Sequence, residues 1–80
     1  MKRQIFCTFP QDLIKEPFLF LLTKDFEVVP NILGASVTDE IAVLTLELEG
    51  DSGVIAEAIQ WLRRKGVQVE LIEGAQGSLS

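Results

Sequence analysis

The sequence predicts an α+β sandwich in which a four-stranded antiparallel sheet carries two helices on one face, in the chain order βαββαβ. Two observations carry this prediction. Several short segments alternate apolar and other residues, as strands do, and two further segments repeat apolar residues at helical spacing. Right-handed crossovers then place both helices on the same side of the sheet. The 80 residues suffice for one domain, which we assign to residues 1–74, with residues 75–80 as a frayed tail.

The first strand is expected over Lys2–Phe9, which is rich in β-forming residues, and Pro10 ends it because proline cannot donate to a ladder. Helical spacing of apolar residues follows. Because Pro17 is tolerated in the first turn of a helix but not in its interior, the first helix is expected over residues 16–24. The run Phe18–Leu22 is apolar on almost every side, so part of it must face something beyond the domain's own sheet.

The second strand is expected over Phe26–Val37, and Pro30 in its middle indicates an edge strand or a bulge. A short polar turn, Thr38–Glu40, follows. Ile41–Glu49 then alternates most clearly of all, with leucines on one face, and is expected to pair antiparallel with the second strand.

The second helix is expected over Val54–Lys65, where the apolar residues form one face, with Asp51 or Ser52 as its N-cap. Gly66 fits the left-handed residue that commonly follows a helix. The last strand is expected over Val67–Ile72.

Apolar residues occur on both faces of the expected strands. Two helices on one side of the sheet can cover only one of these faces. Two helices cannot cover all of Val37, Ile41, Val43, Val67, Val69 and Leu71 in addition to Leu44, Leu46, Leu48, Phe6 and Ile72. The chain is 48% hydrophobic, which is high for so short a domain. We therefore expect an apolar sheet face opposite the helices that contacts another protein, most simply a second copy in a homodimer.

Composition narrows the function. A net charge of −5 argues against nucleic acid as a partner. The single cysteine, Cys7, cannot hold a zinc ion or an iron–sulfur cluster, and is expected as a small buried strand residue. Histidine, the commonest general base in enzymes, is absent. Glu47 and Glu49 share a strand face, but no third residue is fixed beside them to complete a metal site. We expect no enzymatic activity, no cofactor and no metal.

The longest apolar run is far shorter than the ~20 residues of a membrane-spanning helix, and no signal peptide is visible. We therefore expect a cytoplasmic protein that does not insert into a membrane.

Five segments, in order and at matching spacing, resemble the NIL domain family. They are Glu16–Phe18, Val29–Leu33, Leu46–Gly50, Ala58–Leu62 and Gly66–Leu71. The family is named after an Asn-Ile-Leu triplet, present here as Asn31-Ile32-Leu33. The likeness spans roughly residues 5–72.

The resemblance implies an ACT-like, ferredoxin-like βαββαβ fold. NIL domains occur at the C-terminus of methionine-importer ATPases, where paired domains bind methionine and shut transport down, and also fused to small ferredoxins. The resemblance further implies that Asn31 takes part in binding the ligand. Leu33, Ala35 and Val37 share its strand face by period-two spacing, and are expected to line the site for a thioether side chain.

Three departures from the family pattern matter. No ATPase domain accompanies these residues, so we expect the domain to act on a separate protein. The ferredoxin cysteines are absent, which excludes electron transfer by this chain. The connection Thr38–Glu40 also looks shorter than the glycine-containing hairpin expected in the importer ATPases.

Two functions stay open. The first is a regulatory domain that senses methionine or a related amino acid at a dimer interface. The second is a protein–protein interaction module without a small ligand, acting as a partner in sulfur or methionine metabolism. Asn31 likewise has a structural alternative, in which its amide satisfies backbone groups where Pro30 interrupts the ladder.

Overall fold

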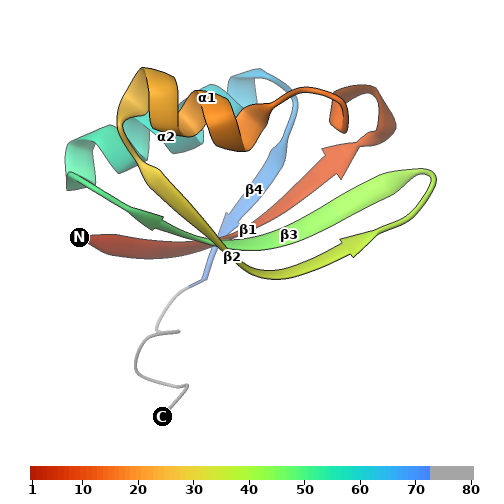
Figure 1. The fold of residues 1–80 in the computed structure, drawn as a ribbon, viewed down its shortest axis with the longest axis horizontal. Coiled ribbons are helices and arrows are strands. Elements are labelled where there is room, and N and C mark those ends of the chain that lie inside the picture. The colour runs from red at the N-terminus through yellow and green to blue at the C-terminus, as the bar shows by residue number, and fades with distance from the viewer. Residues whose placement is uncertain (73–80) are drawn as a thin grey trace, which may run out of the picture.

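The computed structural model describes residues 1–72 as two layers, with α1 and α2 above a sheet of four antiparallel strands (Figure 1). The strand order across the sheet is β2-β3-β1-β4. The elements are β1 (Lys2–Pro10), a 3-10 turn (Gln11–Leu13), α1 (Phe18–Phe26), β2 (Val29–Val37), β3 (Ile41–Glu49), α2 (Ser52–Arg64) and β4 (Gln68–Leu71). The predicted ferredoxin-like fold is confirmed. The predicted tail, residues 75–80, lies outside the described residues.

The core fills the space between the helices and the sheet. Successive side chains of a strand point to opposite faces, so only one row of each strand can meet the helices. On β1 that row is Ile5, Cys7 and Phe9, all buried. The helices, the other strands and the residues just before β2 and β4 complete the core with Phe18, Leu22, Val28, Ala42, Leu46, Leu48, Ile55, Ala58, Ile59, Leu62, Val67 and Val69.

Helix α1 begins at Phe18, two residues after the expected start, and extends to Phe26. Pro17 occupies its N-cap position, where a missing N–H is harmless. Glu27, the residue that follows the helix, has a left-handed backbone (φ 56°), and its N–H donates to the carbonyls of Leu22 and Thr23. The second strand therefore begins at Val29 rather than at Phe26.

Helix α2 begins directly after Asp51, one of the two expected N-caps. The Oδ2 atom of Asp51 accepts hydrogen bonds from the backbone N–H groups of Gly53 (3.0 Å) and Val54 (3.3 Å). At the other end Gly66 has φ 102°, the left-handed conformation expected there.

Replacing Asp51 by alanine is expected to lower the free energy of unfolding by about 1 kcal/mol, because two N–H groups of the first turn of α2 lose their acceptor. Urea unfolding followed by circular dichroism measures this loss. Ser52→Ala is the matched control, since Ser52 is exposed and lies inside the helix. An equal loss for both variants would contradict the assignment of Asp51 as the cap.

The sheet face opposite the helices, called here the outer face, is not the apolar surface that the sequence predicts. Val67 and Val69 are buried on the helix side, because Val69 pairs with Cys7 in the core row of β1. The outer face carries mostly polar residues, and the apolar residues on it are Phe6, Val29, Ile41 and Val43. The polar residues are Lys2, Gln4, Thr8, Asn31, Ser36, Thr45, Glu47, Glu49, Gln68 and Glu70.

No helix within residues 1–72 combines the length and the apolar character needed to cross a bilayer.

Candidate functional site

A β-bulge divides the edge strand β2, which carries the predicted site residues. Before the bulge, Asn31 pairs with Glu47 and Ile32 pairs with Leu46 on β3. After it, Gly34 pairs with Thr45, the next residue of β3, so Leu33 is an extra residue without a partner. The edge position of β2 predicted from Pro30 is confirmed.

The bulge separates the predicted site residues onto two faces of the sheet. Ala35 pairs with Leu44 and Val37 pairs with the buried Ala42, so both lie on the helix side. Asn31 lies on the outer face. The expectation that Asn31, Leu33, Ala35 and Val37 share one strand face is therefore wrong. The inserted residue shifts the alternation by one position, and spacing along the sequence alone does not reveal it.

On the outer face, Asn31 belongs to a row of polar side chains that crosses three strands. Glu47 of β3 lies between Asn31 of β2 and Gln4 of β1 in the pairing register. The Nε2 atom of Gln4 donates to the Oε2 atom of Glu47 at 3.5 Å. Asn31 is exposed, and Glu47 and Gln4 are partly buried. A carboxylate thus lies between two amides on one face of the sheet.

The next row on the outer face consists of Phe6, Thr45 and Gly34. A Cβ atom built on Gly34 would meet no other atom within 4 Å, so open space lies over Gly34, in the row next to Asn31. Phe6 offers the only aromatic ring among the described outer-face residues and is 36% exposed. We call these two rows together, Gln4, Glu47, Asn31, Phe6, Thr45 and Gly34, the Asn31 platform.

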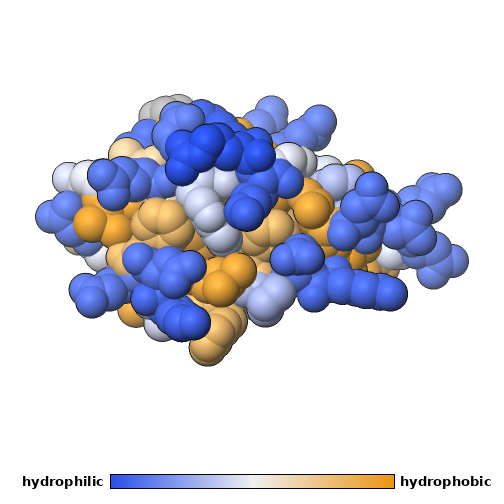
Figure 2. All heavy atoms as spheres, turned by 90° about the horizontal axis from the view of Figure 1, so that it is seen from above, coloured by the Kyte–Doolittle hydropathy of each residue, from blue (hydrophilic) through white to orange (hydrophobic). Residues whose placement is uncertain are grey.

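A second candidate site is an open apolar groove on the helix side. It has a volume of about 260 Å³ and lies between the chain segment that enters α1 and strand β3. Its lining residues are Phe9, Leu13, Ile14, Glu16, Pro17, Phe18, Leu19, Phe20, Ala42 and Leu44. Phe20 is 62% exposed, which confirms that part of the apolar run of α1 faces away from the domain's own sheet. Figure 2, which looks onto the helices, shows apolar atoms at the surface among charged side chains.

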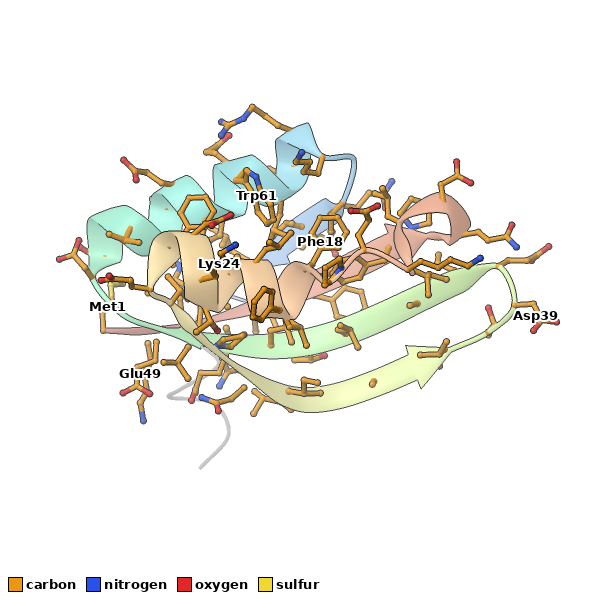
Figure 3. All side chains as sticks on the ribbon, turned by 45° about the horizontal axis from the view of Figure 1, so that its top comes forward. Met1, Phe18, Lys24, Asp39, Glu49 and Trp61 are labelled. Carbon is orange, nitrogen blue, oxygen red and sulfur yellow. The ribbon has the colours of Figure 1, made fainter. Side chains whose placement is uncertain are left out.

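Aromatic packing behind the groove holds its wall in place. Phe18 packs against Phe9, with ring centroids 5.4 Å apart, and edge-on against Trp61 at 5.6 Å. Trp61 in turn contacts Phe26 at 5.4 Å. Figure 3 shows Phe18 of α1 and Trp61 of α2 in the helical layer above the sheet. Trp61 is therefore a partly buried packing residue.

The sequence model of the NIL domain matches residues 6–71, nearly the whole described chain. The chain belongs to the NIL domain family. Its curated relatives include methionine import ATP-binding proteins. The one from Desulfitobacterium hafniense is 39% identical over 62 residues, which cover 72% of this chain and 18% of the relative. The one from Listeria innocua is 33% identical over 66 residues, which cover 78% of this chain and 20% of the relative.

This NIL domain therefore spans about a fifth of the length of the curated relatives it matches. Among solved structures, it is similar to the C-terminal domain of an ABC transporter ATP-binding protein from Enterococcus faecalis, with a TM-score of 0.78. The sequence identity is 21%, and the match covers 89% of this chain and 83% of the other. That likeness shows the shared fold.

Cys7 is fully buried in the NIL domain core, as expected for a small strand residue. Burial raises the pKa of its thiol to about 12, because the charged thiolate is poorly solvated there. The thiol is therefore not an accessible nucleophile. No group of three or more metal-ligating side chains gathers anywhere in residues 1–72.

Proposed function

We propose that this NIL domain is a non-catalytic regulatory domain of the cytoplasm that senses methionine or a related amino acid where two copies pair. Its relatives are methionine import ATP-binding proteins, and the family match covers nearly the whole described chain. We propose methionine binding for this chain because of the residues that form the Asn31 platform.

The observation that carries the proposal is the exposure and hydrogen bonding of Asn31. Its side chain is exposed, and among residues 1–72 it hydrogen-bonds to no protein group. This counts against the structural alternative, in which the amide satisfies backbone groups beside Pro30. An amide both donates and accepts, so it suits the charged end of an amino acid. The open space at Gly34 lies next to it.

The other predicted ligand contacts take different places in the proposal. Leu33 lies at the bulge, 51% exposed, and stays a proposed contact for the ligand side chain. Ala35 and Val37 lie on the helix side of β2, so a ligand on the outer face of the same copy does not reach them. We assign these two residues to the pairing of two copies instead.

The pairing surface follows from the hydrogen-bond pattern of β2. The N–H of Thr38 donates to the carbonyl of Ile41 at 2.8 Å, so Ile41 and every second residue of β3 direct their backbone toward β2. Their partners include Gly34 and Ser36. Ala35 lies between Gly34 and Ser36, and Val37 follows Ser36. Because the backbone direction alternates along a strand, Ala35 and Val37 direct their N–H and C=O groups to the free edge of the sheet.

The free edge lacks the usual protection against pairing. None of the nine residues of β2 is charged, whereas exposed edges normally carry lysines or other charges. Pro30 and the bulge confine unobstructed pairing to residues 34–37. Stacking two outer faces is less favourable, because it would bury the carboxylates of Glu47, Glu49 and Glu70. Edge-to-edge pairing of β2 with a second copy is therefore the proposed dimer.

Methionine at a hundredfold excess over its dissociation constant is expected to stabilise the folded protein by about 2.7 kcal/mol, because it binds the folded state alone. Thermal melts with and without the amino acid measure this shift. The variant Asn31→Ala should lose the shift, and Ser36→Ala, on the same face of the same strand, should keep it. Melts that none of the twenty amino acids displaces would contradict the proposal.

The apolar groove favours a second candidate function, a protein–protein interaction module that works without a small ligand. Its lining is almost entirely apolar, and Phe20 projects at its rim. If this function is the right one, Asn31→Ala changes stability alone, while Phe20→Ser weakens binding of the partner.

A further inference from the structure

Glu47 is the nearest cross-strand neighbour of Asn31. Residue pairs directly opposite each other in a sheet place their side chains on the same face, with Cβ atoms about 5 Å apart. Asn31 and Glu47 form such a pair. The backbone of Ile41 hydrogen-bonds to β2, and every second residue of β3 has the same backbone direction. Glu47 lies six residues after Ile41, so its backbone also faces β2, and Asn31 and Glu47 form a hydrogen-bonded pair. An amide and a carboxylate therefore lie together on one exposed surface.

Gln4 orients the carboxylate from its other side. The carbonyl of Gln4 accepts from the N–H of Ile72, so its backbone is directed toward β4 and away from β3. Gln4 and Glu47 are thus a pair without backbone bonds, in which side chains approach more closely. The amide of Gln4 donates to Oε2. Within residues 1–72, Oε1 of Glu47 accepts no hydrogen bond.

We infer that Glu47 is a second ligand-binding residue, and that its carboxylate binds the ammonium group of a free α-amino acid whose carboxylate is held by the Asn31 amide. This inference rests on the proposed function. An ionised carboxylate accepts hydrogen bonds only, and an ammonium group donates only, so the two are complementary. Charge-assisted hydrogen bonds of this kind are roughly twice as strong as neutral ones.

The neighbouring row gives the ligand side chain a place. An α-amino acid carries its ammonium and carboxylate groups on one carbon atom, and the cross-strand pair Asn31–Glu47 is spaced to hold both. The side chain then extends over Gly34, where a Cβ atom would meet no other atom, toward Thr45 and Phe6 in the same row. A thioether makes a favourable contact with an aromatic ring. The arrangement selects a free amino acid with an apolar side chain.

The experiment compares methionine with the analogue of methionine that lacks the amino group, by calorimetric titration of the whole chain. The wild type should bind methionine at least about tenfold more tightly than the analogue. The variant Glu47→Gln keeps the size of the side chain but not its charge. It should bind methionine about tenfold more weakly and no longer distinguish the two ligands.

Glu49→Gln is the matched control. Glu49 lies on the same strand and outer face but pairs with Val29, outside the Asn31 platform (Figure 3). It should leave both affinities unchanged. If the wild type binds both ligands equally, or Glu47→Gln retains full discrimination, the inference about Glu47 is overturned and the proposed function stands. If neither ligand binds the wild type, both are overturned. Should Glu47→Gln fail to fold, the wild-type ratio still decides.

Discussion

Replacing Leu46 by alanine is expected to lower the free energy of unfolding by about 2–5 kcal/mol, which is the usual cost of a leucine-sized cavity in a core. Leu46 is 0% exposed, and it lies on β3 between Ile5 of β1 and Ile32 of β2. Natural domains have about 0.05–0.15 kcal/mol of stability per residue, or roughly 4–12 kcal/mol for 80 residues. The substitution therefore removes a large part of the total.

Urea unfolding of the two proteins measures this difference, and Leu33→Ala is the matched control. Both substitutions delete the same atoms, but Leu33 is 51% exposed at the bulge and leaves no enclosed cavity. We expect the control to lose less than about 1 kcal/mol. Equal losses would mean that the helix-facing row of β3 is not the centre of the core.

The strand over Ile41–Glu49 and the second helix could be predicted from sequence because one local rule governs each. Every second residue of β3 is buried or partly buried against the helices, which produces the alternation directly. Helix α2 buries one stripe and exposes the rest. The start of β2 could not be predicted in this way. Phe26 continues α1 because its ring packs on Trp61, a contact with a residue far along the chain.

The candidate site could be predicted only in part, and the bulge is the physical reason. Asn31 was identified through the family triplet, and its exposure on the outer face is compatible with the proposed role. The position of Ala35 and Val37 depends on how β2 pairs with β3, which local spacing does not encode. The sequence places Glu47 on the strand face opposite the leucines of β3. Its place beside Asn31 becomes evident only from the pairing register.

The apolar outer face was the expectation that failed most broadly. Hydrophobic composition measures how much apolar surface exists but not where it lies. In the structure, much of the exposed apolar surface lies on the edge strand β2, at Val29, Ile32, Leu33 and Val37, and on α1, at Phe20. The surface available for pairing therefore moves from the face of the sheet to its edge.

Replacing Ala35 by proline is expected to weaken the pairing of two copies strongly while leaving the monomer folded. The N–H of Ala35 is directed to the free edge, so its loss removes no hydrogen bond to β3. Pro30 already occupies an equivalent outward position on the same strand. In a two-fold dimer both copies carry the substitution, so the interface loses two N–H donors and gains two proline rings.

Sedimentation over a range of protein concentrations measures the monomer–dimer equilibrium, and we expect Ala35→Pro to weaken association by more than about tenfold. Ala35→Val is the matched control, since valine keeps the N–H group and favours the strand conformation. A wild-type protein that stays monomeric at high concentration would exclude edge pairing altogether. A variant that dimerises as tightly as the wild type would instead move the interface to the groove beside Phe20. The variant distinguishes the two interfaces, because association through the groove does not involve the backbone N–H groups of β2.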